Sequence, residues 1–571
     1  MSPPGCVDCG DGVRLERGVR ARMRDGVELI SDHYYSPQPG PHPTILMRQP
    51  YGRDIASTVV YAHPVWFARH GYNIVIQDVR GRGDSEGEFY PFRNEGADGA
   101  DTIAWLRARP ESNGRVGMYG FSYQGITQLL AAAEQPEGLQ CISPGMAACD
   151  LYHGWFYQGG ALRLASTLGW GLQLLKEDAR RKKLREASEM LEHAWAHLAA
   201  QTSVLPVRAH RALHSEGLPQ YVLDWFDHNA PGDYWGALDV SRRLNKILIP
   251  ALHVSGWYDT FLRGSVDGFV ALSNCAGTEF ARRNQFLLAG PWLHIPWGDR
   301  IGAADFGPEA LIDTDAMLLR WFNHWLKDSG SFANEARIRH FVLGENRWRE
   351  ADRFSTGADR AFFLRSEGRA NSRKGNGVLS TTAPSAKEPC DIFVYDPEVP
   401  VIAPGGPAAA SGQFDQAALE LGNNLLVYSS APLEEPLRIF GKPRAVLHCS
   451  TSAISADFTA KLVRVRANGA ADFICIGIAR STHLFAGSKY EADKIYRWEI
   501  SLEPTSCRFE RGECVRLEIA GSAFPLLDRN SGSDVPSCEA TSWDWRRSTH
   551  MVFHSDESPS ALYLPLAEDP Q

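Results

Sequence analysis

The feature that most constrains this chain is a serine placed between two glycines, where a short apolar run meets a helix-forming stretch. The run Arg115–Tyr119 leads into Gly120, Ser122 and Gly125, and leucines and alanines follow. A strand that turns directly into a helix strains the residue at its apex, and small neighbours permit the close approach. The pattern predicts a nucleophile elbow at Ser122. Because the second glycine lies one place later than in G-x-S-x-G, a serine that only caps the helix is the alternative.

Short apolar runs alternate with helical stretches in the first third of the chain, and the pattern resumes after residue 245. Continuous apolar runs separated by helices indicate a parallel sheet that is covered on both faces. In such a sheet, ligands gather at the carboxyl ends of the strands. The predicted strands are Thr44–Arg48, Asn73–Asp78, Arg115–Tyr119, Ile247–Val254 and Gln285–Ala289, and Gly96–Arg109 is a predicted helix.

A candidate catalytic residue follows each of the last three predicted strands. Ser122 follows the first of them, Asp259 the second and His294 the third. The chain order Ser, Asp, His on strand-end loops is that of the α/β-hydrolase triad. Taken singly, an aspartate in a turn is usually a cap or turn residue, and a histidine after Gly-Pro-Trp-Leu is usually packed or exposed. Their joint order, spacing and location predict a catalytic triad.

Five segments of the chain share residues with one known family. They are Met47-Arg-Gln-Pro-Tyr51, Gln77-Asp-Val-Arg-Gly-Arg-Gly-Asp-Ser-Glu-Gly87, Gly120-Phe-Ser-Tyr-Gln-Gly125, Gly256-Trp-Tyr-Asp259 and Gly290-Pro-Trp-Leu-His294. Through them the chain resembles the cocaine esterase and X-prolyl dipeptidyl-peptidase family of α/β-hydrolases, which includes cephalosporin acylases and α-amino acid ester hydrolases. The similarity spans nearly the whole chain. In this family the displaced glycine and the tyrosine after the nucleophile are the normal form, so the resemblance implies the same triad.

Two groups are expected to stabilise the oxyanion of the reaction. The backbone N–H of Tyr123, the residue after the nucleophile, is placed there by the geometry of the elbow. The resemblance implies that the side chain of Tyr51 supplies the second donor, whereas Tyr51 judged on the sequence alone is a packing residue. A charged cluster beside a strand end is interpreted as ion pairs and turn residues that order a loop: Asp78, Arg80, Asp84 and Glu86.

Strand signals stop between residues 150 and 244, where leucines recur at helical spacing. A helical insertion between two strands of such a sheet predicts a cap over the active site. Trp155 and Trp170 in the cap, with Trp257 and Phe261 below it, are candidates for a wall that binds an apolar acyl group. Core packing is the alternative for each of these aromatic residues.

The character of the sequence changes after about residue 337. Residues 496–502 and 515–519 alternate between apolar and polar side chains, which predicts strands with one buried and one solvent-exposed face. Asn468-Gly469 is a hairpin turn signal. We expect an antiparallel β-sandwich here, and the resemblance implies a jelly roll. The predicted domains are 1–149 and 245–336 for the α/β-hydrolase domain, 150–244 for the cap and 337–571 for the sandwich.

Composition argues against several classes of protein. A net charge of −9 disfavours nucleic acid as a partner, and no apolar run is long enough to predict a membrane span. Eleven scattered cysteines and an amino terminus without a signal-peptide core predict a cytoplasmic protein. The pair Cys6 and Cys9 lacks the further ligands of a zinc site, so no metal or other cofactor is expected. A small-molecule ester or amide is the expected partner, and a homodimer is compatible with the sequence.

The sequence therefore predicts a serine hydrolase that cleaves a carboxylic ester through an acyl-enzyme intermediate. An amide-cleaving member of the same family, either an X-prolyl dipeptidyl peptidase or a β-lactam side-chain acylase, is the alternative. Such a peptidase needs a carboxylate for the substrate amine, and none adjoins Ser122, although Asp227 or Asp233 in the cap could serve. An inactive binding protein on the same fold is a remote alternative, because all three triad residues are present.

Overall fold

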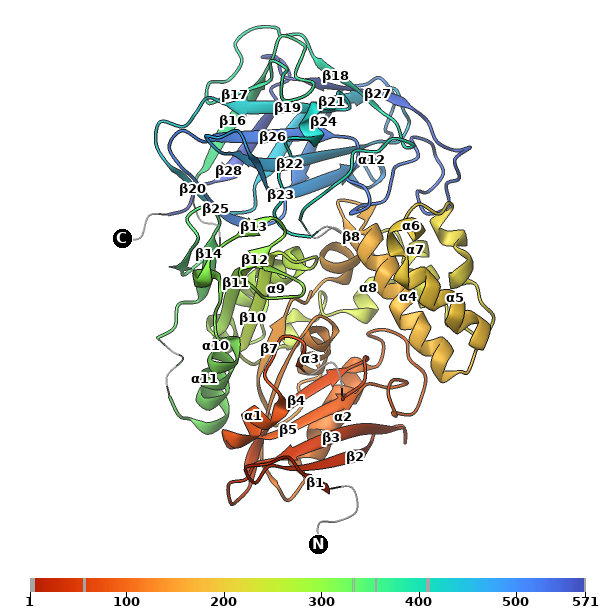
Figure 1. The fold of residues 1–571 in the computed structure, drawn as a ribbon, viewed down its shortest axis with the longest axis vertical. Helices are drawn as coiled ribbons and strands as arrows, with labels where there is room; N and C mark the ends of the chain where they lie inside the picture. Colours follow the sequence, from red (N-terminus) through yellow and green to blue (C-terminus); the bar gives the residue numbers. More distant parts are fainter. Residues whose placement is uncertain are drawn as a thin grey trace.

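The computed structural model describes residues 6–54, 58–330, 332, 334–354, 357–406 and 411–568. Figure 1 shows an α/β domain that contains the amino terminus, a group of helices at its side, and a β-rich domain at the other end of the long axis. Within the described residues, no helix is long and apolar enough to cross a membrane.

The α/β domain is built on an eleven-stranded sheet with the order β1-β2-β3-β5-β4-β6-β7-β10-β11-β14-β15. Its centre, from β5 to β14, is parallel, and the flanking strands are antiparallel. The strands are β1 (Cys6–Asp8), β2 (Arg14–Arg22), β3 (Glu28–Tyr35), β4 (His42–Gln49), β5 (Asn73–Asp78), β6 (Ser112–Phe121), β7 (Leu139–Gly145), β10 (Ala251–Tyr258), β11 (Gln285–Leu293), β14 (Ile338–Val342) and β15 (Arg347–Ala351).

All five predicted strands overlap observed ones, and the predicted parallel sheet is confirmed. The largest shift is at β10, which begins at Ala251 rather than at Ile247. Pro250 precedes it, and a proline cannot donate the backbone hydrogen bond that a strand inside a sheet requires. The strand therefore begins only after Pro250; it extends to Tyr258, and Asp259 follows it directly.

Helices cover both faces of this sheet, and alternate residues of each strand enter different cores. In β4, Leu46 joins the core that contains residues of α2 and α3, whereas Ile45 and Met47 join the core that contains residues of α1 and α11. This alternation follows from the two-residue period of a strand. The helices are α1 (Pro64–Arg69), α2 (Glu95–Arg107), α3 (Tyr123–Ala133), α9 (Leu262–Cys275), α10 (Glu279–Arg283) and α11 (Thr314–Lys327).

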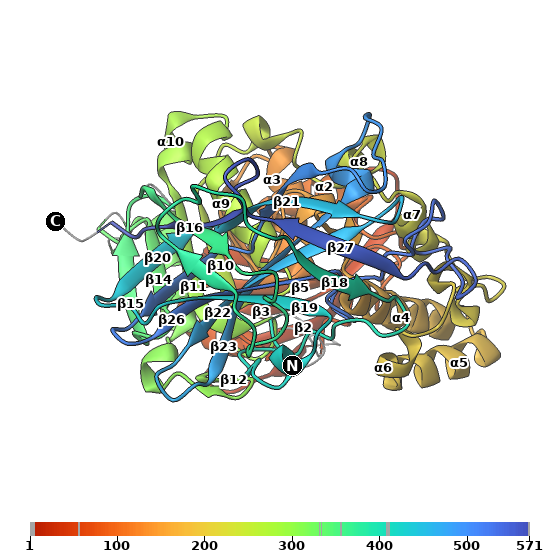
Figure 2. The same ribbon diagram turned by 90° about the horizontal axis from the view of Figure 1, so that it is seen from above.

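The cap lies between β7 and β10 in the chain and is mainly helical, as predicted. A short antiparallel pair, β8 (Tyr157–Gln158) with β9 (Ala161–Leu162), is the departure from that expectation. In Figure 2 the helices α4, α5 and α6 lie on one side of the molecule and α10 and β15 on the other. The cap helices are η2 (Tyr152–Phe156), α4 (Leu164–Arg181), α5 (Arg185–Ala196), α6 (Leu198–Gln201), α7 (Tyr221–Asp227) and α8 (Asp233–Leu238).

A buried ion pair fastens the cap to the α/β domain. Arg82, in the loop after β5, lies 3.0 Å from Asp178 of α4, and both side chains are almost fully buried. The hydroxyl of Tyr221, on α7, donates to the same carboxylate at 2.7 Å. Because breaking a buried ion pair leaves an uncompensated charge, these contacts stabilise the packing of the cap against the loop after β5.

The carboxyl-terminal domain is the predicted β-sandwich, and the predicted fold class is confirmed. A second eleven-stranded sheet runs β18-β27-β21-β28-β16-β17-β19-β26-β22-β23, with β24 also paired to β21, and every pair except β17 with β19 is antiparallel. Its strands are β16 (Asp359–Arg365), β17 (Val378–Ser380), β18 (Asp391–Tyr395), β19 (Leu425–Ser430), β21 (Arg444–Thr451), β22 (Asp457–Val465), β23 (Ala471–Arg480), β24 (Tyr496–Ser501), β26 (Cys514–Ala520), β27 (Ser548–Phe553) and β28 (Ala561–Pro565). The smaller elements of this domain are β20 (Leu437–Gly441), β25 (Thr505–Phe509) and α12 (Ser481–Leu484), and a short pair before it in the chain is β12 (Arg300–Ile301) with β13 (Ala304–Asp305).

Two details differ from the sequence-based expectation. The strands β14 and β15 pair with the first sheet, so that sheet extends to Ala351, beyond the predicted boundary at 336/337. The solvent-exposed face that the sequence predicts for β26 is also not observed, because Arg516 and Glu518 are both buried. β26 lies between β19 and β22, and its polar side chains pair with Glu420 and Lys461. The alternation holds at β24, where Arg497, Glu499 and Ser501 are exposed.

Candidate active site

Ser122 lies at the apex of a sharp turn from β6 into α3. Its φ is 61° and its ψ is −129°, which is a strained conformation for a residue with a side chain. Its backbone N–H donates to the carbonyl of Gly145 at 2.8 Å. The residue occupies the N-cap position, yet its side chain makes no capping hydrogen bond. The geometry is therefore that of an elbow, and the capping alternative does not apply.

The glycine that stands one place late has a packing reason. A Cβ atom at Gly125 would lie 2.7 Å from the Cβ of Ala147 and 2.8 Å from the carbonyl oxygen of Gly145. Both distances are too short for real contacts, and one of the partners is backbone that cannot move aside. Helix α3 can pack this closely on the strand end only because residue 125 has no side chain.

His294 and Asp259 lie side by side on the loops that follow β11 and β10. The Nδ1 atom of His294 lies 2.7 Å from Oδ1 of Asp259, and the aspartate side chain is fully buried. An ionised carboxylate only accepts, so this bond assigns the imidazole proton to Nδ1 and leaves the lone pair on Nε2. Phe121, the residue before Ser122, contacts the imidazole with ring centroids 5.4 Å apart. We call Ser122, Asp259 and His294 the candidate triad.

Tyr51 follows β4 and presents its hydroxyl to the same region. The indole Nε1 of Trp170, on cap helix α4, donates to the Tyr51 hydroxyl oxygen at 3.1 Å. Burial raises the pKa of Tyr51 to about 12, while hydrogen bonds from Trp170 and Ser122 act in the opposite direction. Tyr51 therefore remains protonated near neutral pH and can act as a hydrogen-bond donor.

Tyr123 is the first residue of α3, so its backbone N–H has no partner inside the helix by position. Its side chain points the other way, into the core. The phenol donates to Glu95 at 2.8 Å and accepts from the backbone N–H of Phe92 at 3.0 Å. Arg48 pairs with the same glutamate at 3.0 Å, and all of these groups are buried. The network anchors the start of the helix behind Ser122.

Three of the four aromatic residues predicted to form a substrate wall come together beside His294. The Phe261 ring lies perpendicular to the imidazole, with centroids 5.2 Å apart. Trp155 stacks on Phe261 at 3.6 Å, and Trp170 lies 5.5 Å from Trp155. Phe92, which no pattern in the sequence indicates as a site residue, packs with its ring centroid 5.8 Å from those of both tryptophans.

Trp257 does not lie with the other three. Its indole donates to the carbonyl of Phe341 at 2.7 Å, and its ring packs in the core that extends into the β-sandwich. Successive residues of a strand point to opposite faces, so a position close to Asp259 in sequence does not bring a side chain to the site.

Two carboxylates considered for an amine site are engaged elsewhere. Asp227 pairs with Arg208, and Asp233 pairs with Arg242 at 2.7 Å with its own side chain almost fully exposed.

The charged residues at the end of β5 and in the loop after it form ion pairs and loop hydrogen bonds, as interpreted from the sequence. Arg53 contacts Asp32, Asp78 and Asp84; Arg80 contacts Asp25 and Asp98; and Glu86 accepts from the backbone N–H of Glu28.

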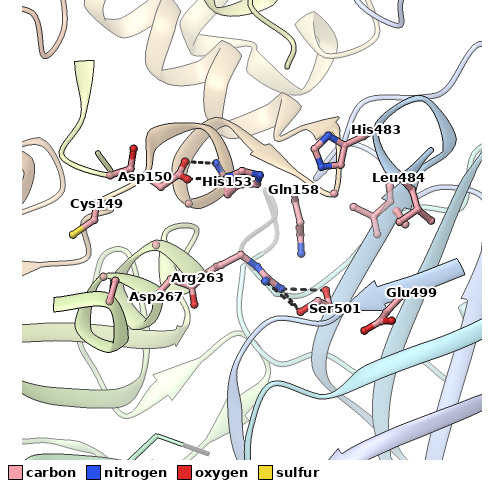
Figure 3. A pocket seen from close by; sticks show the side chains of 18 of the residues that line it. Cys149, Asp150, His153, Gln158, Arg263, Asp267, His483, Leu484, Glu499 and Ser501 are labelled. Atoms are coloured by element: carbon pink, nitrogen blue, oxygen red, sulfur yellow. Dashed lines mark hydrogen bonds and ion pairs between the residues drawn. The ribbon is translucent and has the colours of Figure 1, made fainter. Parts of the chain in front are cut away.

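A separate cavity of about 550 Å³ lies where the start of the cap meets α9 and the β-sandwich. Figure 3 shows Asp150 beside His153 at one end of it, and Arg263 reaching across to Ser501. No member of the candidate triad lines this cavity.

Among the described residues, no group of three His, Cys, Asp or Glu side chains could hold a metal ion. The Cys6 side chain of the C-x-x-C pair lies outside the described part of the chain.

Comparison with known proteins covers nearly the whole chain. Residues 25–296 match the X-Pro dipeptidyl-peptidase (S15 family), and residues 330–563 match the X-Pro dipeptidyl-peptidase C-terminal non-catalytic domain. Cocaine esterase of Rhodococcus sp. (strain MB1 Bresler) is 33% identical over 96% of this chain and 98% of its own. Two similar solved structures are an aminopeptidase from the marine sediment archaeon Thaumarchaeota archaeon (TM-score 0.80, 24% identity) and an α-amino acid ester hydrolase (TM-score 0.78, 23% identity), each covering 99% of this chain and 98% of the other.

Proposed function

The chain belongs to the family of cocaine esterase and the S15 X-Pro dipeptidyl-peptidases, which are serine hydrolases. From this premise we propose that it hydrolyses esters of apolar, aromatic carboxylic acids through an acyl-enzyme on Ser122. The observation that carries the proposal is the His294–Asp259 pair, 2.7 Å apart, whose imidazole contacts Phe121, the residue before a serine in an elbow conformation. Among the described residues, this pairing occupies Nδ1 of His294 and leaves Nε2 to accept a proton from a nucleophile, as a general base must.

The first half of the reaction forms the acyl-enzyme. Nε2 of His294 takes the proton from the Ser122 hydroxyl as the oxygen attacks the ester carbonyl. Asp259 holds the imidazole in the required tautomer and stabilises its cation. The tetrahedral oxyanion accepts hydrogen bonds from the Tyr51 hydroxyl and the Tyr123 N–H. The intermediate collapses when His294 returns the proton to the leaving alcohol.

In the second half, water replaces the alcohol. His294 takes a proton from water as the water oxygen attacks the acyl carbonyl, and the same two donors stabilise the second oxyanion. Collapse of this intermediate breaks the bond to Ser122, whose oxygen regains its proton from His294. The products are the carboxylic acid and the free enzyme.

The walls of the site favour an aromatic acyl group over a charged one. Trp155, Trp170, Phe92 and Phe261 form a contiguous group of rings that reaches His294 through Phe261, and aromatic rings pack well against another ring. One buried carboxylate of α2, Glu95, is neutralised by Arg48 and bonded to the Tyr123 phenol. Glu95 is therefore not available to hold a free amine, which supports an esterase rather than an aminopeptidase.

A substrate panel tests the proposal. We expect p-nitrophenyl benzoate and phenylacetate to exceed p-nitrophenyl acetate in kcat/KM by about tenfold or more, because an apolar pocket discriminates by roughly 1–3 kcal/mol per group. Anilides of X-Pro dipeptides and of single amino acids should be turned over far more slowly. A preference for these anilides would instead support the amide-cleaving alternative. A fluorophosphonate probe should label the wild type and fail to label Ser122→Ala; labelling of both would refute the nucleophile.

A further inference from the structure

The hydrogen bond between Trp170 and Tyr51 joins two parts of the molecule that are 119 residues apart in the chain. Tyr51 lies in the loop after β4, and Trp170 lies in the middle of cap helix α4. An indole N–H donates but does not accept. The Tyr51 oxygen is therefore the acceptor in this bond, and its own proton is left to point toward another group. The Ser122 side chain acts on the pKa of Tyr51 in the same direction as Trp170, as a donor to the phenolic oxygen does, so neither of these two groups takes the phenolic proton.

The direction of the Trp170 N–H is set by the rings around it. Trp225 stacks on it with an interplanar angle of 2° and centroids 5.2 Å apart. Trp155 lies 5.5 Å away, and Phe92 and Phe156 lie 5.8 and 6.2 Å away. An indole packed on several sides has few alternative orientations, so its donor is fixed before substrate binds.

We propose that Trp170 is a positioning residue for the oxyanion hole: its indole holds the Tyr51 oxygen so that the phenolic proton faces the carbonyl that Ser122 attacks. The inference rests on the role proposed above for Tyr51. It gives the cap a part in the rate of reaction as well as in the choice of substrate.

The chemistry of the phenol supports this arrangement. When Tyr51 donates to an oxyanion, its oxygen gains negative character, and a hydrogen bond that it already accepts becomes stronger. The bond from Trp170 acts in the same sense on the phenol itself, because it lowers the pKa of Tyr51 against the effect of burial. The indole should therefore stabilise the transition state more than the ground state, and its loss should appear in kcat.

The experiment compares Trp170→Phe with Trp225→Phe. Both changes shrink one ring of the same stacked pair, but the Nε1 atom of Trp225 is buried without a hydrogen-bond partner among the described residues. We expect Trp170→Phe to lower kcat about 3- to 12-fold, the value of a single hydrogen bond. The loss should be similar for acetyl, butyryl and benzoyl p-nitrophenyl esters. Trp225→Phe keeps an aromatic ring stacked on Trp170 and should change kcat less than twofold. Equal losses in the two variants would mean that packing alone is responsible.

A double-mutant cycle separates this inference from the proposed function. In a Tyr51→Phe background, Trp170→Phe should lower kcat by no more than twofold, because there is no hydroxyl left to position. An unchanged loss in that background would overturn the positioning role. If Tyr51→Phe by itself leaves kcat intact while Ser122→Ala abolishes it, the role proposed for Tyr51 is wrong and the positioning role is refuted with it, although the esterase assignment stands. A reordering of ester preference by Trp170→Phe, without a common loss, would assign Trp170 to the substrate wall only.

Discussion

The candidate triad has a counterpart of the same composition in the β-sandwich, where Ser366, Asp391 and His554 lie together; we call these three residues the buried cluster. Ser366 donates to Asp391 at 2.7 Å, and Nε2 of His554 lies 3.0 Å from the same carboxylate oxygen. Nδ1 of His554 lies 3.1 Å from Glu388. Both imidazole nitrogens are thus taken by carboxylates, and the serine proton is directed to the aspartate.

At the candidate triad the same residue types are connected differently. Asp259 contacts one nitrogen of His294 and leaves the other for a substrate-side partner. The imidazole is 28% exposed, whereas His554 is fully buried. Ser122 also has a strained backbone conformation, although it is as buried as Ser366. The comparison teaches that the connections and the exposure of the histidine, rather than composition, distinguish the candidate triad from the buried cluster.

The sharpest way to break this comparison is to remove each serine. Ser122→Ala should lower kcat by about 10⁶-fold on a p-nitrophenyl ester, because the nucleophile is lost. Ser366→Ala should leave kcat within twofold of the wild type. Circular dichroism should show that both variants are folded. If Ser366→Ala proved inactive and Ser122→Ala retained more than a few per cent of activity, the assignment of the two sets would be reversed.

Removing the aspartate charges should have opposite consequences in the two places. Asp259→Asn should lower kcat about 10⁴-fold with little change in the urea midpoint, because the amide favours the wrong tautomer of His294. Asp391→Asn should keep kcat and lower stability by roughly 1.5–3 kcal/mol, the value of a charged hydrogen bond. The two readouts are steady-state kinetics and urea unfolding. An active Asp259→Asn enzyme would show that another acid orients the histidine.

Each site also has a tyrosine that can be changed without losing its ring. Tyr51→Phe should lower kcat about 10²- to 10³-fold while KM changes little, because an oxyanion donor acts mainly in the transition state. Tyr428 donates to Asp391 at 2.7 Å, so Tyr428→Phe should lower the urea midpoint and leave kcat unchanged. A kcat within threefold of the wild type for Tyr51→Phe, measured with an enzyme that the probe still labels, would mean that the second donor lies elsewhere.

The smallest expected effect is the dependence on pH of the stability that Asp391 contributes in the buried cluster. Burial raises the pKa of Asp391, but hydrogen bonds led by those from His554 and Ser366 outweigh it and leave the pKa below its usual value. A group whose pKa is lowered by folding stabilises the protein above its unfolded pKa, about 3.9, and loses that contribution as the pH falls through the folded value. The stability difference between wild type and Asp391→Asn should therefore be constant above about pH 5 and narrow below pH 4. Urea midpoints from pH 3 to 7 measure it, and a difference that widens in acid would contradict the lowered pKa.

Local pattern was sufficient for most of the fold. Apolar runs such as Asn73–Asp78 are continuous because a central parallel strand is buried on both faces, so they can be identified without tertiary information. The local pattern gave a wrong prediction at Arg516 and Glu518: their alternation with apolar residues predicts a solvent-exposed face, but both side chains are buried. Glu420 and Lys461 supply their partners from distant segments, and no local rule can show that such partners exist.

By itself the sequence determined the elbow at Ser122 and the strand-end positions of Asp259 and His294. These follow from short-range chemistry and from the rule that parallel strands end at a common edge. Only the tertiary structure decided that Trp170 donates to Tyr51, that Trp257 packs away from the site and that Ser366 joins a buried cluster. Each of these depends on the direction of a side chain and on a partner far away in the chain, and neither is encoded in the spacing of residues along it.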